Sequence, residues 1–256
     1  MAQTVLITGT SSGIGKAAVL AFAKAGWNVA ATMRTPEKVN DFDAMPTVRK
    51  YALDVTDPVS IDRALNAVQK DFGKLDAVVN NAGYGLDGVF EAMTDDAIAK
   101  QFDTNVFGLM RVTRAAIQRM RAQGGGTIIQ VSSMGGRITF PLYSIYHSTK
   151  WAVEGFTESV HYEVRPFNIR MKLIEPGIIQ SEFYGRSRQF VKPTDTTVYD
   201  AYLRKFETAA NEAMQKAEKP ELVAKEIVRA AEDRSDKMRY PIGYPSPLLL
   251  RLRKLV

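Results

Sequence analysis

The stretch TVLITGTSSGIGKA, residues 4–17, decides the fold of this chain. Its first five residues are apolar or β-branched, which is typical of a buried strand. A glycine-rich segment with Gly9, Gly13 and Gly15 follows, and a helical pattern comes after it. Glycines at such a turn let the chain leave the strand sharply and let a pyrophosphate approach a helix N-terminus closely. The stretch therefore predicts a dinucleotide-binding loop, with a merely structural turn as the alternative.

Strand and helix patterns alternate along most of the chain. Several strand candidates are apolar at consecutive positions, as strands covered on both faces should be. Short links between strands and helices indicate right-handed βαβ crossovers. We expect an α/β fold, namely a three-layer Rossmann-type doubly wound parallel sheet of about seven strands with helices on both faces. The expected strands are Thr4–Thr8, Asn28–Met33, Val48–Asp54, Asp76–Asn81, Gly126–Ser132, Ile169–Glu175 and Lys237–Ile242.

Residues 178–219 break this alternation. No strand is expected there, and the segment has the pattern of one or two loosely patterned helices joined by a polar connector around VKPTDTT. Ligands bind beyond the carboxyl ends of the strands in doubly wound sheets, where this segment begins. We predict a substrate lid at about 178–219 within one catalytic domain spanning residues 1–256, with a packing excursion as the alternative.

The end of the second strand tests which dinucleotide would bind. An NAD site needs an Asp or Glu there for the ribose 2′-hydroxyl. Here Met33 is followed by Arg34, and no acid comes before Glu37. A guanidinium can hold a 2′-phosphate in bidentate fashion, with the Ser11 hydroxyl as a second contact. The sequence therefore favours NADP(H), the alternative being that Arg34 is an ordinary surface charge.

The stretch SIYHSTKW, residues 144–151, places Tyr146 and Lys150 four positions apart, on one face of a helix. A tyrosine with a pKa near 10 is a poor base at neutral pH. An ammonium one turn away, together with an oxidised nicotinamide, would lower that pKa toward the working range. The neighbouring His147 is rotated about 100° around the helix from Tyr146, so we expect it to take no part in catalysis.

Three further stretches give this pair its context: VVNNAG at 78–83, NVFG at 105–108 and VSS at 131–133, thirteen residues before Tyr146. Together with TGTSSGIG, they resemble the short-chain dehydrogenase/reductase family in its shorter, single-domain branch, over roughly residues 4–180. The resemblance implies that Tyr146 is the general acid/base and that Lys150 assists it and holds the nicotinamide ribose. It also implies that Ser133 binds the substrate oxygen and that Asn105 anchors a water in a proton relay.

The same resemblance extends the cofactor site. Asp54 and Val55 should contact adenine, and Pro176, Gly177 and the Ile179 backbone should lie near the nicotinamide. Many relatives carry a threonine in that last segment, where this chain offers Ser181. The full set expected at the cofactor is Gly9, Ser11, Gly13, Ile14, Gly15, Arg34, Asp54, Val55, Asn81, Ala82, Gly83, Tyr146, Lys150, Pro176, Gly177 and Ile179.

The substrate is constrained less. The stretch ATMRTPEK and the C-terminus DKMRYPIGYPSPLLLRLRKLV look like the branch that holds 17β-hydroxysteroid and retinol dehydrogenases. Apolar residues around the expected site favour a hydrophobic ketone, aldehyde or alcohol, unless they only pack the lid. They are Phe90, Met93, Phe140, Leu142, Tyr143, Phe183, Tyr184 and Phe190. The expected substrate contacts are Ser133, Phe140, Tyr143, Tyr146 and Phe183.

Composition narrows the function classes. The chain has no cysteine and two histidines, so neither thiolate nor zinc chemistry is expected and no metal is predicted. The net charge is +6, but the sequence contains no nucleic-acid-binding motif, so we expect no nucleic-acid partner. Neither a signal peptide nor an apolar run long enough to cross a bilayer is visible, so we expect no stable membrane insertion and a cytoplasmic location.

Two other function classes remain to be weighed. A catalytically silent dinucleotide sensor or scaffold would be expected to lack the Tyr or the Lys, and both are present. A sugar-nucleotide epimerase or dehydratase usually needs a longer C-terminal domain than this chain offers. The resemblance also implies a homodimer or homotetramer, assembled through the helices that contain Asn105 and Tyr146.

Overall fold

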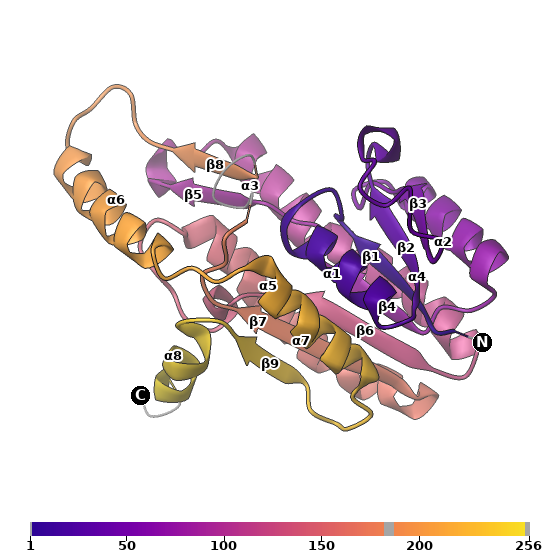
Figure 1. Cartoon of the computed structure of the whole chain (residues 1–256). Helices are drawn as coiled ribbons and strands as arrows, with labels where there is room; N and C mark the ends of the chain where they lie inside the picture. Colours follow the sequence, from indigo (N-terminus) through magenta and orange to yellow (C-terminus); the bar gives the residue numbers. More distant parts are fainter. Residues whose placement is uncertain (1, 182–186, 254–256) are drawn as a thin grey trace.

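The computed structural model describes residues 2–181 and 187–253. A parallel sheet of seven strands forms its centre, as the sequence predicts (Figure 1). The strands lie in the order β3-β2-β1-β4-β6-β7-β9, and every neighbouring pair is parallel. Their bounds are β1 Thr4–Thr8, β2 Asn28–Met33, β3 Val48–Ala52, β4 Ala77–Asn80, β6 Gly126–Val131, β7 Ile169–Pro176 and β9 Arg239–Ile242.

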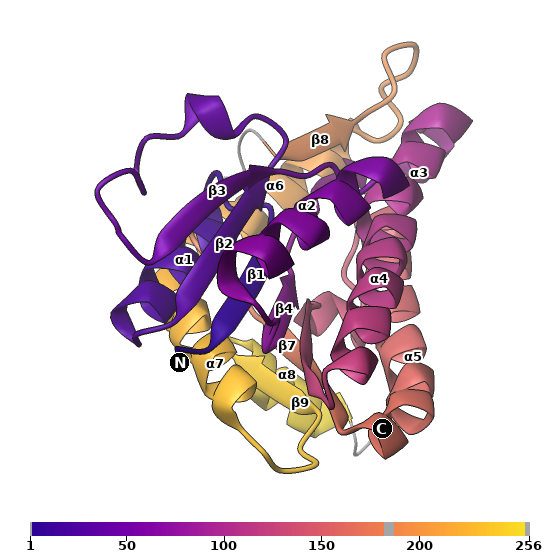
Figure 2. The same cartoon turned by 90° about the vertical axis from the view of Figure 1, so that its right-hand side faces the viewer.

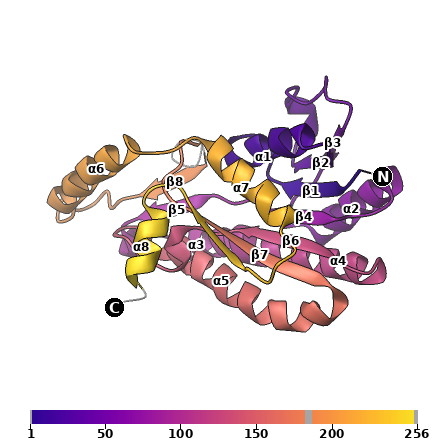
Figure 3. The ribbon, with the colours of Figure 1, turned by 60° about the horizontal axis from the view of Figure 1, so that its bottom comes forward.

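Helices cover both faces of this sheet. In Figures 2 and 3, α1 and α7 lie on one side of the strands, and α4 and α5 lie on the other. The three layers are those of a doubly wound fold. Strands are added outward from β1 in one direction (β2, β3) and then from β4 in the other, so the strand order switches between the adjacent strands β1 and β4. The helices are α1 Gly13–Lys24, α2 Pro58–Phe72, α3 Asp95–Phe102, α4 Leu109–Ala122, α5 Ser144–Val164, α6 Asp200–Met214, α7 Pro220–Glu232 and α8 Ser246–Leu252.

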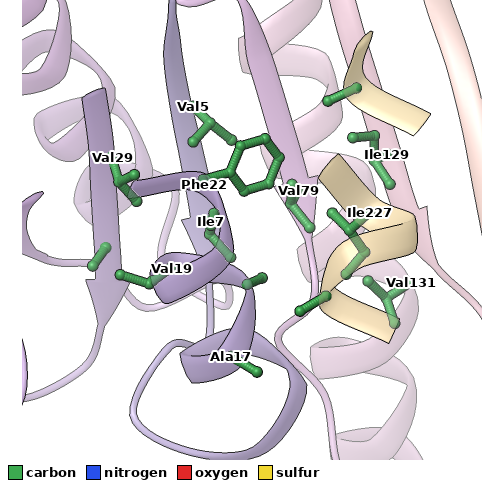
Figure 4. Packing of buried hydrophobic residues seen from close by; sticks show 14 of the residues in the cluster. Val5, Ile7, Ala17, Val19, Phe22, Val29, Val79, Ile129, Val131 and Ile227 are labelled. Atoms are coloured by element: carbon green, nitrogen blue, oxygen red, sulfur yellow. The ribbon is translucent and has the colours of Figure 1, made fainter. Parts of the chain in front are cut away.

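Alternate residues of the central strands point into two separate hydrophobic cores, one on each face of the sheet. Val5 and Ile7 of β1 pack with Phe22 of α1 and Ile227 of α7, a cluster seen in Figure 4. Leu6, between them, points into the other core, which α2, α4 and α5 complete. Burying one such side chain stabilises the fold by about 1.5–3 kcal/mol. Consecutive apolar residues in the strands are therefore explained by burial on both faces.

Helix α2 has a residue suited to each of its ends. The Asp57 carboxylate accepts a 2.9 Å hydrogen bond from the Val59 N–H, and Pro58 occupies the first turn, where its missing donor costs nothing. Gly73 ends the helix at φ 84°, a conformation that glycine adopts without strain. Pro220 likewise opens α7.

The expectation that residues 178–219 contain no strand is wrong. Strand β8 (Arg188–Val191) pairs in parallel with β5 (Gly85–Gly88), forming a second, two-stranded sheet outside the central one. The Arg188 guanidinium binds the buried Asp87 carboxylate through two nitrogens, with Nε–Oδ2 at 2.8 Å. This strand is short and partly polar, and it lies outside the regular alternation of strands and helices, so the sequence does not indicate it. Helix α6 follows it at the end of the molecule far from the N-terminus (Figure 1).

The long helical pattern over residues 95–123 is interrupted. Between α3 and α4 lies a π-helix, η3 (Asp103–Gly108), with Asn105 inside it. Such bulges often occur at functional sites. The short 3-10 turns are η1 Pro36–Lys38, η2 Phe90–Ala92, η4 Met134–Gly136 and η5 Arg165–Phe167.

Candidate active site

The glycine-rich loop lies at the carboxyl end of β1, beside the loop that follows β4. A Cβ on Gly15 would lie 2.2 Å from the Gly9 carbonyl oxygen and 2.5 Å from the Asn81 amide nitrogen. That amide donates 3.0 Å hydrogen bonds to the carbonyls of both Thr8 and Gly9. Because Gly15 has no side chain, the start of α1 can lie directly against the Gly9 backbone and the Asn81 amide. Asn81, which follows β4, holds the loop in place through its two hydrogen bonds.

The N-terminus of α1 suits an anion. Ser12 is the N-cap residue, yet its side chain makes no capping hydrogen bond, so the first N–H groups lack that partner. Gly9, Ser11, Gly13 and Ile14 all line a cavity at this helix end. Uncapped N–H groups and the positive end of the helix dipole favour a phosphate there. The residues present fit a dinucleotide pyrophosphate.

The end of β2 adds positive charge to the same cavity. Arg34 and Lys38 both line it, as Ser11 does. Asp41 lines it as well, but its carboxylate forms a salt bridge with Lys16. Sequence reasoning identified Arg34 and missed Lys38, which lies in the 3-10 turn η1 that follows. Its signal was the basic character of RTPEK directly after the strand.

Asp54 and Val55, after β3, also line the cavity. The Asp54 Oδ1 accepts hydrogen bonds from the N–H and hydroxyl of Thr56, at 2.9 and 2.7 Å, which fixes the loop. A Cβ on Gly108 of η3 would lie 2.7 Å from a Val55 methyl. The π-helix therefore approaches this loop too closely for a side chain at position 108.

Lys150 is held beneath Tyr146 on α5. Its Nζ donates a 2.8 Å hydrogen bond to the Val131 carbonyl at the end of β6 and lies 5.7 Å from the centroid of the Tyr146 ring. Burial lowers the pKa of Lys150 to about 8. The negative charge of Glu154, one turn further along the helix, acts in the opposite direction and raises this pKa. Both Tyr146 and Lys150 line the cavity.

Ser133 follows β6 and begins the turn η4. Its hydroxyl oxygen accepts a 3.0 Å hydrogen bond from the Gly135 N–H. Since a hydroxyl also carries one donor, this contact leaves its hydrogen for another acceptor in the cavity. Ser133 lines the cavity together with Tyr146, Lys150 and Asn105, so the four residues assigned to catalysis by the resemblance face one space.

Asn105 lies in η3, where its amide is bound to the backbone of Tyr84. The Oδ1 accepts from the Tyr84 N–H at 3.1 Å, and the Nδ2 donates to the Tyr84 carbonyl at 2.9 Å. A longer contact of 3.4 Å joins Nδ2 to the Thr149 hydroxyl. The side chain thus fixes the loop after β4 against α5, a positioning task that the sequence did not indicate.

Pro176, Gly177 and Ile179 form the cavity wall after β7. A Cβ on Gly177 would lie 2.3 Å from the Tyr244 carbonyl oxygen, so a glycine is needed for this wall to meet the segment after β9. Ser181 lines the cavity close to Gly13, whose added Cβ would lie 3.3 Å from the Ser181 Cβ. The position expected to replace the threonine of many relatives is therefore next to the phosphate loop.

The aromatic residues divide into those that line the cavity and those that do not. Phe140 and Tyr143 line it, together with Phe206 of α6, which the sequence did not indicate. The Tyr143 ring lies 5.9 Å from that of Phe206, joining the wall to α6. Phe183 and Tyr184 lie outside the described residues. Phe90, Met93, Leu142 and Phe190 do not line the cavity. Phe190 stacks on Phe206 instead, in keeping with the alternative that such residues pack the lid.

A buried ionic cluster lies behind the site. Arg239 of β9 binds both Glu154 of α5 and Glu175 of β7, at 3.1 and 3.3 Å, and Arg137 binds Glu175 at 3.2 Å. Burial and the nearby charge of Glu175 raise the pKa of Glu154 to about 7. Arginines opposite buried carboxylates offset part of the cost of burying them. The sequence gives no sign of this cluster, because its members come from four separate segments.

This geometry can be compared with known proteins. The model of the short chain dehydrogenase family matches residues 3–192. The chain belongs to this family. It is similar to a short-chain dehydrogenase structure from Streptomyces avermitilis, with 32% identity, a TM-score of 0.87, and coverage of 100% of this chain and 93% of that one. Retinol dehydrogenase 8 of Bos taurus is 34% identical over 89% of this chain and 77% of its own.

A further solved structure, of ElxO with NADP bound, is 29% identical with a TM-score of 0.78 and covers 93% of this short-chain dehydrogenase and 97% of its own chain. Membership of the family makes the chain an oxidoreductase and confirms the expected fold class. Within residues 2–181 and 187–253, no helix is long and apolar enough to cross a membrane. Those residues also contain no group of three or more potential metal ligands.

Proposed function

We propose that this chain is an NADP(H)-dependent oxidoreductase that moves a hydride between the nicotinamide and a hydrophobic ketone, aldehyde or alcohol, with Tyr146 as general acid/base. One observation carries the proposal. Ser133, Tyr146 and Lys150 line a single cavity together with the glycine-rich loop and the end of β2. A dinucleotide on that loop and a substrate beside Tyr146 would therefore share one space.

The residues divide the chemistry between them. The bound dinucleotide supplies the hydride in one direction and accepts it in the other. In reduction, the Tyr146 hydroxyl gives its proton to the substrate oxygen as the adjacent carbon gains the hydride, and the Ser133 hydroxyl donates a hydrogen bond to the same oxygen. The Lys150 ammonium then stabilises the phenolate. Asn105, through the loop and helix that it joins, would hold the path by which a water returns the proton.

The choice of NADP(H) rests on charge at the end of β2. Arg34 and Lys38 both line the cavity there, and Asp41, an acid that also lines it, is paired with Lys16. A guanidinium matches a phosphate in a bidentate way, and a second cation adds to the attraction. The structure of ElxO with NADP bound supports the same choice by analogy.

The substrate class rests on the cavity wall and on a lid. Phe140, Tyr143 and Phe206 favour an apolar substrate, and the likeness to retinol dehydrogenase 8 is in keeping with one. We propose that β8 and α6, within residues 178–219, form the lid of a single catalytic domain. The Tyr143–Phe206 contact would then join the lid to the site.

The test follows NADPH absorbance against a panel of hydrophobic ketones and aldehydes, with Tyr146→Phe as the matched variant. We expect turnover of at least one member and a loss of about a hundredfold or more in Tyr146→Phe, with NADPH binding retained. If Tyr146→Phe keeps full activity, or if NADPH binds and no panel member is turned over, the proposal fails. The second outcome would favour a catalytically silent dinucleotide sensor or scaffold.

Assembly and location are further proposals. We infer a homodimer or homotetramer formed through the helices that contain Asn105 and Tyr146. Phe107 of η3 and Trp151 of α5, which are 49% and 44% exposed, offer apolar contacts on those helices. Sedimentation of the purified chain would report the mass directly. A cytoplasmic location stays a prediction, which fractionation of expressing cells would test.

A further inference from the structure

His147 is buried in the wall of the proposed active site. It follows Tyr146 on α5, and only 5% of its surface is exposed, yet its ring lines the same cavity. The helical rotation of about 100° that separates it from Tyr146 does not carry it away from the site, because the chain before α5 folds back over it. Rotation around the helix, from which we expect no catalytic part for His147, therefore does not decide where its ring lies.

The imidazole contacts the turn that carries Ser133. A Cβ on Gly135 would lie 2.4 Å from the His147 Cδ2, 2.6 Å from Nε2 and 3.4 Å from the Ser133 hydroxyl oxygen. The Gly135 N–H is also the donor to that hydroxyl. One edge of the imidazole therefore packs directly on the residue that orients Ser133.

The other nitrogen holds the opposite wall. His147 Nδ1 accepts a 3.3 Å hydrogen bond from the Phe140 N–H. The segment that follows is bent, with Leu142 at φ 65°, a conformation that a branched side chain seldom adopts. Its second anchor is the Leu142 carbonyl, which accepts a 2.7 Å bond from the Gly88 N–H. A bend of this kind persists only where the surrounding contacts hold it.

Three aromatic rings enclose the imidazole. The Tyr143 ring stacks on it with 5.3 Å between the ring centroids, and the ring centroids of Phe140 and Tyr146 each lie 5.8 Å from that of the imidazole. Burial lowers the pKa of His147 to about 4, so the ring is neutral at physiological pH. A neutral imidazole that accepts at Nδ1 must carry its proton on Nε2, the atom that faces Gly135.

We propose that His147 is a positioning residue, whose neutral imidazole fixes the Ser133 turn on one side and the Phe140–Tyr143 wall on the other, and so sets where a substrate carbonyl sits over Tyr146. It touches neither a proton in transit nor the reacting atoms. The inference rests on the proposed function, because it assigns the geometry of that same site.

The kinetic test uses two side chains of nearly equal shape. In His147→Asn, the amide oxygen can take the place of Nδ1 and accept from Phe140, whereas His147→Leu offers no acceptor. We expect His147→Leu to lower kcat by about tenfold or more and NADPH affinity by less than twofold, because misplaced reactants cost rate rather than cofactor binding. His147→Asn should recover several-fold over His147→Leu. Ser148→Ala, on the exposed side of the same turn, should match the wild type.

Equal kcat values for His147→Asn and His147→Leu, or wild-type values for both, would overturn the proposal. The same holds if the loss appears only in thermal stability. Failure of the proposed function is separate, since it would appear as turnover that survives in Tyr146→Phe.

A second measurement needs no substrate. With two histidines in the chain, ¹⁵N-histidine NMR gives two imidazole systems, and the one missing from His147→Asn is His147. We expect a proton on Nε2, none on Nδ1, and no titration between pH 5 and 8, as a pKa of about 4 requires. A proton on Nδ1, or titration near pH 6.5, would contradict the proposed contact with Phe140.

The packing on Gly135 can be tested through stability alone. Gly135→Ala should lower the melting temperature more in the wild type than in the His147→Ala background, because alanine ends at Cβ and has neither of the atoms that the new methyl group meets. An equal loss in both backgrounds would place the imidazole elsewhere.

Discussion

The Nζ of Lys150 lies 5.7 Å from the centroid of the Tyr146 ring and donates a 2.8 Å hydrogen bond to the Val131 carbonyl. The end of β6 therefore holds the Lys150 ammonium close to the Tyr146 ring. Tyr146 lies four residues earlier on the same helix, which keeps the ring next to this ammonium. Because burial lowers the pKa of Lys150 to about 8, part of its charge is lost within the range in which such an enzyme would be assayed.

The first prediction concerns this ammonium. Lys150→Met should reduce turnover by about a hundredfold or more, because the phenolate form of Tyr146 loses its cation. In the wild type, that electrostatic support should decline as pH rises through about 8, since the folded protein then binds one proton fewer at Lys150. A pH–rate profile checks both points. Lys70→Met, exposed on α2, is the control, and an equal loss in both variants would point to a general charge effect.

The second prediction concerns cofactor choice. Arg34→Ala should weaken NADPH binding by about tenfold or more and leave NADH binding within about twofold, because only NADPH carries the 2′-phosphate that the guanidinium would hold. Fluorescence titration with each cofactor measures this. Arg63→Ala, exposed on α2 and outside the cavity, controls for lost positive charge. A parallel loss for both cofactors would assign Arg34 to the general attraction of anions.

The third prediction contrasts two glycines. Gly15→Ala should abolish dinucleotide binding and lower stability, because its Cβ would lie 2.2 Å from the Gly9 carbonyl oxygen. Gly155 lies on α5 outside the cavity, where an added Cβ would meet open space within this chain, so Gly155→Ala should leave NADPH binding unchanged. Thermal unfolding and NADPH titration check both. Normal binding in Gly15→Ala would mean that the loop can move away from the strand.

The strands β1, β2, β4, β6 and β7 could be predicted because they are buried on both faces, which leaves an apolar run in the sequence. The edge strands β3 and β9 are partly exposed and more polar, and only their place in the alternation of strands and helices indicates them. The β5–β8 pair could not, because it lies outside the central sheet and depends on an ion pair between Asp87 and Arg188, whose positions are far apart in the chain. The π-helix around Asn105 was hidden for a related reason. Its residues fit a helical pattern, and the bulge follows from contacts with Tyr84 and Val55.

Some residues of the candidate site could likewise be predicted from the sequence, and others could not. Residues at strand ends and on the glycine loop were predictable, because the doubly wound topology brings strand ends together whatever their side chains. Lys38 and Phe206 were missed, since their place depends on how a turn and a lid helix fold back. The place of His147 in the wall was not predicted, because helical rotation describes one helix alone, whereas its surroundings come from the segment before the helix.

The fourth prediction concerns the buried ionic cluster. Arg239→Met should lower the free energy of unfolding by about 3 kcal/mol, because it leaves Glu154 and Glu175 buried without that partner. Arg165→Met removes an ion pair whose partners are 62% and 68% exposed, and should cost less than about 1 kcal/mol. Urea unfolding at pH 7.5 measures both. Similar losses would mean that water or a rearranged Arg137 compensates for the missing guanidinium.

The last prediction concerns the pH dependence that Glu154 brings. Its pKa in the folded protein is raised to about 7 from a usual value of 4.5, so between those values the folded state binds the extra proton. Stability due to this group must then fall as pH rises from about 4.5 to 7. Glu154→Gln, which resembles the protonated acid, should match the wild type at pH 5 and exceed it at pH 8 by at most about 3 kcal/mol.

Urea unfolding at the two pH values checks this sign. Glu158→Gln is the matched control, because Glu158 lies one turn further along α5 and also binds Arg239 but is 52% exposed. Its difference from the wild type should not follow the same trend. Parallel curves for Glu154→Gln and the wild type from pH 5 to 8 would mean that Glu154 stays ionised beside Arg239, so that the arginine, rather than burial, sets its charge.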